Sequence, residues 1–306
     1  MRVGVVDLGT NSTRLLVADV DGGTVHEVAR RTTITRLGEG VDERRRLLPL
    51  PVARVRNVLS DYRRELEQLG AERVLAVATS AVRDAENGEA FLGEIEWSYG
   101  FATRLVTGEE EAELTRRGVA DGRGLENGTL VLDVGGGSTQ LITAGDRLSV
   151  DVGSVRLTER HLRSDPPSAG ELAAAAADLR SVLPDLQPTD AVGVAGTITT
   201  LAALELGGYD RDRVHGHWLS RESIEAQLER LASLPLAKRS ELPGLEPERA
   251  PVIVGGALVV REVLERYGLS GLEASERDLL HGAALEAARL PEPEEGAAPP
   301  GAYTCC

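Results

Sequence analysis

The feature that most constrains this chain is a short glycine-bearing motif that occurs twice. Residues 7–13 spell DLGTNST and residues 133–139 spell DVGGGST, in the same register 126 positions apart. Identical residues occupy four positions: Asp7 and Asp133, Gly9 and Gly135, Ser12 and Ser138, Thr13 and Thr139. Each copy follows one short apolar run and precedes another, which is typical of two strands joined by a turn. The chain therefore contains the same strand–turn–strand unit twice.

A turn of this kind is suited to binding an anion. Glycines directly after a strand allow successive backbone N–H groups to converge on one point, and Ser and Thr hydroxyls add donors. An Asp at the end of the first strand can hold a metal ion or its bound water. One copy alone could be a tight hairpin with no further role. Two copies in one register favour duplicated half-molecules that face each other across a cleft and bind phosphate. Neither copy matches the G-x-x-x-x-G-K-[ST] pattern of a P-loop.

The rest of the chain alternates between strand and helix patterns. Apolar runs predict strands at residues 2–6, 14–20, 24–34, 73–79, 129–134, 139–145 and 190–196. Apolar residues at helical spacing predict helices at residues 52–69, 87–100, 109–121, 168–183, 220–234, 248–268 and 275–290. The strand at residues 190–196 is expected to lead into a further helix through Thr197. Pro251 is expected to break the helix at 248–268 near its start, and Gly255 and Gly256 to loosen it.

This alternation predicts a two-domain α/β protein. We expect a first domain at residues 1–122 and a second at residues 123–274. The last helix, at residues 275–290, is expected to pack back on the first domain. The tail at residues 291–306 is acidic and rich in Pro and Gly, which predicts disorder.

Composition excludes several kinds of function. The 306 residues include 34 basic and 49 acidic side chains, and the net charge of -15 argues against nucleic-acid binding, which needs a basic surface. No apolar run reaches the ~18 residues of a membrane helix, and the N-terminus lacks a secretory-signal pattern, so we expect a cytoplasmic protein without a membrane partner. Cys305 and Cys306 are the only cysteines and provide no disulfide framework. Because Lys238 is the only lysine, a phosphate site must use arginine and backbone N–H groups.

Several motifs, taken together, resemble a known family. They are DLGTNST (7–13), RLGEG (36–40), ATSAVRDAEN (78–87), GEEEAEL (108–114), DVGGGSTQL (133–141), VGSVRLTE (152–159) and AGTITTLAAL (195–204). In this order they resemble the exopolyphosphatase/guanosine pentaphosphate phosphohydrolase (Ppx/GppA) family, within the superfamily of actin, sugar kinases and heat-shock chaperone ATPases. The resemblance covers most of the chain. It implies an α/β fold of two actin-like, ribonuclease H-like domains with an interdomain cleft, and a third glycine–threonine turn at GTITT (196–200).

The resemblance implies a phosphohydrolase that works with Mg²⁺. Family members remove the terminal phosphate of polyphosphate or of guanosine pentaphosphate (pppGpp) by attack of water, and the GEEEA segment (108–112) carries the catalytic base. Register with the second hairpin identifies Glu111 as this base, with Glu110 in reserve and Glu109 as a cap of the helix dipole. A carboxylate suits the role if acidic neighbours raise its pKa towards neutrality, and the three adjacent glutamates could do so by mutual repulsion.

The same resemblance implies the binding residues. Arg83 is expected to hold a phosphate through two N–H groups, with an ion pair to Asp84 or Glu86 as the alternative, and Arg36 is a second phosphate-binding candidate. The phosphate cradle comprises Gly9, Thr10, Asn11, Ser12, Gly135, Gly136, Gly137, Ser138, Gly196 and Thr197. Asp7 and Asp133 are the candidate ligands of Mg²⁺, directly or through water. Trp97 and Trp218 are expected to pack.

Two segments depart from the family pattern. The second hairpin of the family usually ends in Glu, and here that position is Gln140. Near the C-terminus, DLLHG (278–282) has Leu280 and His281 where the family has Arg and Glu. Loss of the carboxylate at position 140 leaves open a sensor that binds polyphosphate or (p)ppGpp with low turnover. A kinase of the same superfamily is a third alternative, against which TSAVRDA and GEEEA argue. Family members often pair, so a homodimer is consistent with the resemblance.

Overall fold

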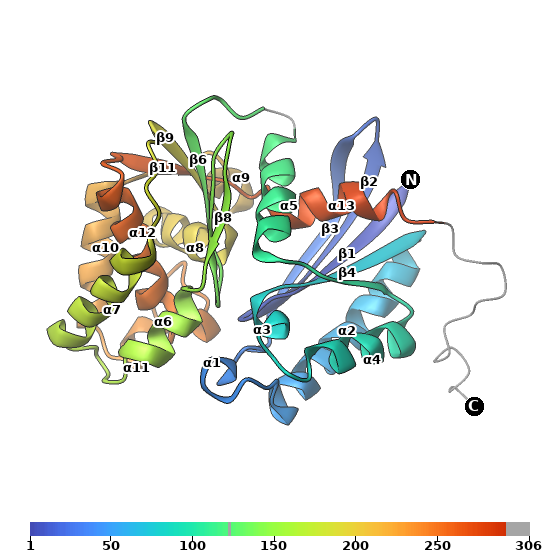
Figure 1. Ribbon diagram of the computed structural model, residues 1–306, viewed down its shortest axis with the longest axis horizontal. Coiled ribbons are helices and arrows are strands. Elements are labelled where there is room, and N and C mark those ends of the chain that lie inside the picture. The colour runs from blue at the N-terminus through green and yellow to red at the C-terminus, as the bar shows by residue number, and fades with distance from the viewer. Residues whose placement is uncertain (122–123, 292–306) are drawn as a thin grey trace. The chain divides into compact units, whose positions relative to one another are not determined.

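The computed structural model describes residues 1–121 and 124–291, which form two compact units (Figure 1). The first unit comprises residues 1–121 together with the C-terminal segment that begins at Leu279, and the second comprises Gly124–Asp278. Each unit has its own sheet and its own apolar core. Residues 292–306 of the tail for which we predicted disorder lie outside the described residues, and this includes both cysteines.

The first unit contains a five-stranded sheet. In chain order its strands are β1 (Arg2–Leu8), β2 (Ser12–Asp21), β3 (Thr24–Ile34), β4 (Arg73–Ala78) and β5 (Ala102–Leu105). The spatial order is β3-β2-β1-β4-β5. Strand β2 is antiparallel to both of its neighbours, whereas β4 and β5 run parallel to β1. The central strand β1 is buried on both faces, which explains its unbroken apolar sequence.

The second unit repeats this topology. Its strands are β6 (Thr129–Val134), β7 (Thr139–Ile142), β8 (Arg147–Val150), β9 (Asp190–Val194), β10 (Trp218–Ser220) and β11 (Gly271–Ala274). The spatial order β8-β7-β6-β9-β11 corresponds strand for strand to β3-β2-β1-β4-β5, and β10 adds an antiparallel edge. The predicted fold class, two α/β domains built on one duplicated sheet topology, is confirmed.

Helices cover both faces of the first sheet. They are α1 (Val41–Arg44), α2 (Pro49–Leu69), α3 (Ser80–Arg83), α4 (Gly88–Tyr99), α5 (Gly108–Ala120) and α13 (Leu279–Ala287). Strand alternation divides the core, because Val6 and Leu8 pack with side chains of α2 and α4, whereas Val3 and Val5 pack with those of α5 and α13. Gly4 lies on the α2 face, where a Cβ would lie 2.1 Å from a methyl carbon of Leu66. The missing side chain therefore lets α2 pack closely on the sheet.

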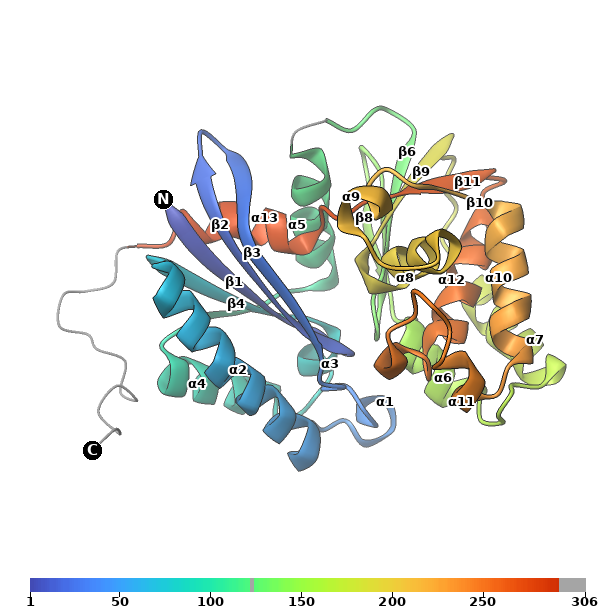
Figure 2. The same ribbon diagram turned by 180° about the vertical axis from the view of Figure 1, so that it is seen from behind.

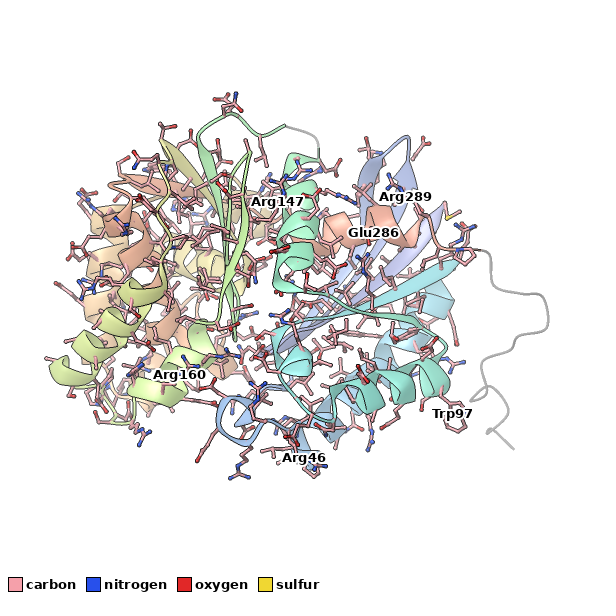
Figure 3. All side chains as sticks on the ribbon, viewed as in Figure 1. Arg46, Trp97, Arg147, Arg160, Glu286 and Arg289 are labelled. Atoms are coloured by element: carbon pink, nitrogen blue, oxygen red, sulfur yellow. The ribbon has the colours of Figure 1, made fainter. Side chains whose placement is uncertain are left out.

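The C-terminal helix α13 is held against α5. A Cβ at Gly282 would lie only 1.9 Å from the carbonyl oxygen of Leu114, so the two helices touch backbone to backbone at this point. Glu286, labelled on α13 in Figure 3, forms ion pairs with Arg104 and Arg117. Helix α13 thereby helps to hold α5, which carries the three adjacent glutamates, in position.

The helices of the second unit surround one almost fully buried helix. They are α6 (Ser154–His161), α7 (Ala169–Val182), α8 (Ala195–Leu206), α9 (Arg211–Val214), α10 (Arg221–Ser233), α11 (Leu236–Arg239), the 3-10 turn η1 (Pro247–Arg249) and α12 (Ile253–Arg266). Helix α12 contacts α6, α7, α8 and α10 (Figure 2). Gly255 and Gly256 bring it close to its neighbours, since Cβ atoms there would lie 2.6 Å from Thr158 Oγ1 and 2.7 Å from Thr197 Cγ2. The predicted loosening of this helix is wrong: its glycines permit close packing.

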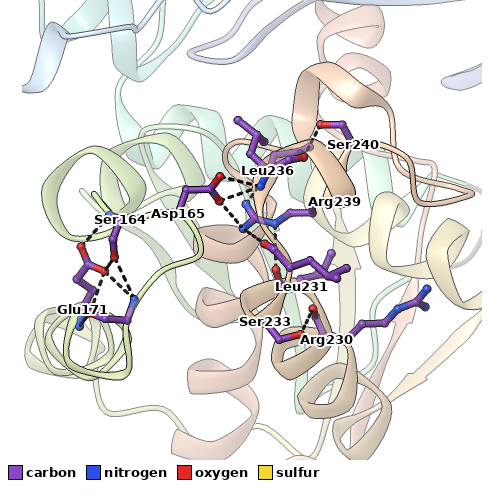
Figure 4. A network of polar contacts seen from close by, with 12 residues as sticks. Ser164, Asp165, Glu171, Arg230, Leu231, Ser233, Leu236, Arg239 and Ser240 are labelled. Carbon is purple, nitrogen blue, oxygen red and sulfur yellow. Dashed lines mark hydrogen bonds and ion pairs between the residues drawn. The ribbon is translucent and has the colours of Figure 1, made fainter.

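A buried arginine ties together several segments of the second unit (Figure 4). Arg239 is 4% exposed and donates hydrogen bonds to the carbonyls of Leu231, Leu234 and Ala250. Burial lowers the pKa of its guanidinium, and the nearby carboxylate of Asp165 opposes this. The arginine thus satisfies backbone carbonyls at the ends of α10 and η1 that would otherwise be buried without donors.

Some elements differ from the sequence prediction. The short strands β5, β8, β10 and β11 were not predicted, because three or four residues are too few to show a period. The last helix begins at Leu279 instead of residue 275, since Ser275 donates its N–H to the carbonyl of Gly193. Trp97 and Trp218 are 63% and 48% exposed, so the prediction that they pack is wrong. Among the described residues, no helix is both long and apolar enough to span a membrane.

Candidate active site

Both copies of the repeated motif form the same four-residue hairpin. In the first, between β1 and β2, the N–H of Gly9 donates to the carbonyl of Ser12 over 3.1 Å. In the second, between β6 and β7, Gly135 donates to Ser138 over the same distance. A Cβ at either glycine would lie about 3 Å from that carbonyl oxygen, at 2.9 and 3.0 Å respectively. Glycine is therefore required by the closeness of the turn, and the two copies are structurally equivalent.

In each hairpin, a segment later in the chain donates hydrogen bonds to the backbone carbonyls. In the first hairpin, Asn11 accepts hydrogen bonds from the N–H groups of Thr35 and Arg36, and Thr10 accepts one from Gly38. The loop at residues 35–38 therefore holds the first hairpin through its carbonyls.

In the second hairpin, the first turn of α6 donates hydrogen bonds to the backbone carbonyls. Gly135 accepts a hydrogen bond from the N–H of Ser154, and Gly136 accepts two, from Val155 and Arg156. Gly153 makes the contact possible, because a Cβ there would lie 2.5 Å from the carbonyl oxygen of Gly136. Donors at a helix N-terminus lack intrahelical partners, so the hairpin carbonyls satisfy them.

This arrangement leaves N–H groups available at the hairpin tips. The N–H groups of Thr10, Asn11, Gly136 and Gly137 donate to no other residue in the described part of the chain. Each belongs to the tip of a hairpin whose neighbouring carbonyls are already hydrogen-bonded, which polarises the peptide and strengthens its N–H as a donor. Converging backbone donors of this kind bind anions.

The two predicted metal ligands face different partners across their hairpins. Asp7 is 4% exposed, and Arg14, opposite it on β2, donates from Nε to its carboxylate over 2.7 Å. Asp133 is 6% exposed, and the residue opposite it on β7 is Gln140. Arg14 and Gln140 are equivalent positions of the repeat. The first carboxylate is therefore neutralised by an arginine, whereas the second faces an amide.

Gln140 is fully buried and only half satisfied. Its Nε2 donates to the hydroxyl oxygens of Ser138 over 2.9 Å and Ser149 over 3.2 Å. Its Oε1 has no hydrogen-bond partner among the described residues. A buried acceptor left without a donor costs about 1–3 kcal/mol of folding free energy. The Gln140 amide therefore destabilises the fold at this position.

The third predicted turn lies at the start of a helix. Gly196 and Thr197 lie in the first turn of α8, directly after β9, so the helix predicted through Thr197 is confirmed and the glycine–threonine turn at 196–200 is part of that helix. The chain enters this helix through Ala195, whose φ of 69° is a left-handed conformation that is strained for a residue with a side chain. The hydroxyl of Thr197 donates to the carbonyl of Val134 over 3.3 Å and so links α8 to the strand before the second hairpin. The N–H groups of a helix start have no intrahelical partners and are suited to binding phosphate.

Glu111 is a buried carboxylate held by an arginine. It lies in the first turn of α5, is 7% exposed, and receives a hydrogen bond and ion pair from Nη1 of Arg83 over 3.2 Å. The same nitrogen donates to the carbonyl of Val106 over 2.9 Å. Arg83, at the end of α3, and Glu111 are thus brought together in the first unit, as a candidate phosphate-binding group beside a candidate base.

Glu110 has a structural role instead. One of its carboxylate oxygens accepts the N–H of Thr107 over 2.8 Å, which completes a capping box at the start of α5, and the other pairs with Arg104 over 2.7 Å. The backbone N–H of Thr107 and then Arg104 lower the pKa of Glu110. Successive residues on a helix point in different directions, so Glu110 turns towards Thr107 and Arg104 while Glu111 pairs with Arg83. The expectation that neighbouring glutamates raise the pKa of the base, Glu111, stays a prediction.

Arg36 lies on the loop that holds the first hairpin. Its N–H binds Asn11, its side chain is exposed, and its φ of 51° is left-handed. A strained non-glycine residue at such a position is a common mark of a functional loop.

Sequence reasoning missed two arginines beside the candidate phosphate cradle. Arg156, 8% exposed, lies in α6 at the second hairpin and within the quoted motif VGSVRLTE, which was a signal for it. The guanidinium of Arg249 lies over Gly196, where a Cβ would be 2.1 Å from its Nη1. No local pattern marks Arg249, because it comes from η1, more than fifty residues along the chain.

Backbone donors at a glycine hairpin in each unit, and a buried carboxylate paired with arginine in the first, are groups suited to the chemistry of a phosphate-handling enzyme. Comparison with known proteins identifies the family. Residues 16–289 match the model of the Ppx/GppA phosphatase family, and the chain belongs to that family.

Relatives of known name and structure agree. Exopolyphosphatase 2 of Mycobacterium tuberculosis is 40% identical over 314 aligned positions, which cover 94% of this chain and 98% of the relative. The crystal structure of an exopolyphosphatase-like protein matches with a TM-score of 0.87 at 34% identity, over 94% of this chain and 99% of that one. The Ppx/GppA family member of Aquifex aeolicus matches with a TM-score of 0.78 at 32% identity, over 94% and 98%. The predicted family and its phosphatase class are confirmed.

Proposed function

We propose that this protein is an exopolyphosphatase that releases the terminal phosphate of inorganic polyphosphate. The observation that carries the proposal is the 40% identity, over nearly the full length of both chains, to a protein named exopolyphosphatase 2. The structure supports it with chemistry suited to an anionic polymer, in a chain whose net charge of -15 would otherwise repel one.

In the proposed reaction, water attacks the terminal phosphorus and the bond to the bridging oxygen breaks. Orthophosphate and a polymer shorter by one phosphate are the products. Glu111 accepts the proton of the attacking water, and Arg83 holds that carboxylate in place through the 3.2 Å ion pair. The tip N–H groups of the hairpins bind phosphate oxygens and stabilise charge that builds up on them during transfer.

Mg²⁺ is part of this proposal. When bound, it would neutralise charge on the phosphate oxygens. Within residues 1–121 and 124–291, no three His, Cys, Asp or Glu side chains gather into a metal site. Magnesium commonly uses only one or two carboxylates and takes its other ligands from water and substrate phosphates. The buried carboxylate of Asp133 fits that role, and the carboxylate of Asp7 fits it less well because Arg14 is bound to it.

Two alternatives to polyphosphate hydrolysis follow from particular observations. The terminal phosphate of pppGpp offers the same anhydride bond, so the hairpin donors do not distinguish it from polyphosphate. The amide of Gln140, at a position where a carboxylate is expected, favours a binding protein with low turnover. The first alternative predicts phosphate release from pppGpp. The second predicts binding of polyphosphate or pppGpp with little release of phosphate from either.

Phosphate release with Mg²⁺ from tripolyphosphate, long-chain polyphosphate and pppGpp tests the proposal. We expect release from at least one polyphosphate, and its loss in Glu111→Gln. Binding of polyphosphate without release from any substrate would identify the sensor. Release from pppGpp alone would replace the proposed substrate, and transfer to an added acceptor in place of water would indicate a kinase.

A further inference from the structure

The amide of Gln140 determines which way the hydrogen bonds run in the second hairpin. A side-chain amide nitrogen only donates, so the hydroxyl oxygens of Ser138 and Ser149 must act as acceptors towards it. Each hydroxyl has a single proton, which is therefore left for another partner. In the described part of the chain, neither hydroxyl donates to a further residue.

Ser138 lies at the candidate phosphate-binding end of the hairpin, where its side chain is buried. It closes the turn that begins at Gly135, one residue after the tip N–H group of Gly137. Ser149 accepts from the same amide but lies on β8, outside the hairpin. The chain therefore contains two serines with one hydrogen-bonding pattern, of which only one belongs to the candidate phosphate cradle.

A carboxylate at position 140 would reverse this pattern. Carboxylate oxygens only accept, so they would take the hydroxyl proton of Ser138 and leave the hairpin one donor short. They would also add negative charge opposite Asp133 and beside a site for an anion. The amide of Gln140 therefore acts on the hairpin through its Nε2, since its Oε1 has no partner among the described residues.

We propose that Gln140 is a positioning residue that makes Ser138 a donor to phosphate. By donating to the hydroxyl oxygen, the amide directs the Ser138 proton away from the sheet and into the hairpin. The hairpin then presents only donors, from backbone N–H groups and one hydroxyl, and binds ionised phosphate without a carboxylate. This inference rests on the proposed function only in taking the second hairpin as a phosphate site.

A double-mutant cycle tests the coupling between the two residues. Tripolyphosphate binding is measured by calorimetry for Ser138→Ala, Gln140→Glu and the double variant, all in a Glu111→Gln background that slows hydrolysis. With Gln140 present, we expect Ser138→Ala to weaken binding about tenfold, as for loss of one charge-assisted hydrogen bond. In the Gln140→Glu background, Ser138→Ala should weaken it less than about twofold, because the hydroxyl no longer donates to phosphate.

Ser149→Ala is the matched control. It removes an equivalent hydrogen bond from the same amide and should leave tripolyphosphate binding unchanged. Equal losses on Ser138→Ala in both backgrounds would show that the amide oxygen faces Ser138, and would overturn the proposal. If Gln140→Glu does not fold, Gln140→Met replaces it, and the cost of Ser138→Ala should then fall to about threefold because the hydroxyl is no longer oriented.

Binding and turnover separate this inference from the proposed function. A protein that binds tripolyphosphate with the expected coupling but releases no phosphate contradicts the hydrolase and supports the role of Gln140. A protein that hydrolyses polyphosphate but shows no coupling contradicts only the role of Gln140. In the hydrolysing protein, Gln140→Glu should raise KM more than it changes kcat, which a general loss of folded protein would not do.

Discussion

The two hairpins share a backbone and differ in the side chain that follows it. Both close with a glycine N–H on a serine carbonyl over 3.1 Å, and in both the tip carbonyls are hydrogen-bonded by a later segment. After the shared serine and threonine, the first copy has Arg14, bound to Asp7, and the second has Gln140, bound to Ser138 and Ser149. The repeat thus preserves the backbone donors and varies the charge beside them.

This difference indicates how the duplicated fold became asymmetric. Backbone N–H groups bind phosphate whatever the neighbouring side chains are, so both copies can retain the glycine turn. The position after Thr13 or Thr139 lies opposite the strand-end carboxylate on the neighbouring strand, and a change there alters charge without disturbing the turn. The first unit also carries the candidate base, which has no counterpart among the residues we assign to the second.

The largest effect is expected at that base. Glu111→Gln should lower kcat for polyphosphate about 10²–10⁴-fold, because the amide cannot accept the proton of water. The matched control is Glu110→Gln, which should keep kcat within about twofold and cost about 0.5–1 kcal/mol of stability through the weakened cap. Steady-state kinetics and urea unfolding measure both. If Glu110→Gln abolishes activity and Glu111→Gln does not, the assignment is off by one residue.

The substitution Arg14→Gln gives the first hairpin the same residue that the second hairpin has at position 140. Arg14→Gln leaves the buried carboxylate of Asp7 without its ion pair, and we expect a loss of about 2–4 kcal/mol of stability. Urea unfolding measures this loss. The double variant Arg14→Gln, Asp7→Asn removes the buried charge as well and should recover most of it. Unchanged stability in Arg14→Gln would mean that other groups neutralise Asp7.

The segments that hold the hairpins should respond unequally to an added methyl group. Gly153→Ala places a Cβ 2.5 Å from a backbone oxygen of the second hairpin, whereas Gly38→Ala places one 2.3 Å from a methyl carbon of Thr10. Backbone cannot turn aside as a side chain can, so we expect Gly153→Ala to cost about 1–3 kcal/mol and Gly38→Ala less. Thermal unfolding of the two variants gives the order, and the reverse order would show that the first hairpin is the more rigid.

The smallest effect concerns pH and compares a helix cap from each unit. Glu171 accepts hydrogen bonds from the hydroxyl of Ser164 and the N–H of Ser168, which lower its pKa from 4.5 to about 2 (Figure 4). A lowered pKa stabilises the fold above pH 4.5, and this contribution is lost as the pH falls towards 2. Glu171→Gln should therefore flatten the fall in stability between pH 5 and pH 3.

The corresponding cap in the first unit serves as the control. Glu110 accepts from fewer groups, and the pKa of its carboxyl is lowered less, so Glu110→Gln should flatten the same fall less than Glu171→Gln does. Urea unfolding at several pH values measures both slopes. A steeper fall in Glu171→Gln than in the unmodified protein would contradict the assignment of the lowered pKa to this cap.

Long periodic elements were predictable because their signals are local. The helix predicted at residues 52–69 is observed as Pro49–Leu69, and it ends at Gly70 with the left-handed conformation that glycine favours. The strand predicted at residues 24–34 has those bounds. The helix predicted through Thr197, after the strand at residues 190–196, is observed as α8 (Ala195–Leu206).

Within the candidate site, residue types were easier to predict than their partners. The sequence singled out both Arg83 and Glu111 but offered an ion pair with a neighbour as the alternative for the arginine. The observed pair joins residues 28 positions apart, on α3 and α5. No local pattern reports such a pairing, since it depends on how two helices pack on one sheet.

The sequence by itself determined the duplicated α/β architecture and the two glycine turns, because hydrophobic period and glycine content act over a few residues. Only the tertiary structure decided which partner each polar group receives. It assigned Arg14 to Asp7, the first turn of α6 to the carbonyls of the second hairpin, and the Gln140 amide to Ser138. Hydrogen bonds and ion pairs are short-range and directional, so their pairing is fixed only when packing brings distant segments within about 3 Å of each other.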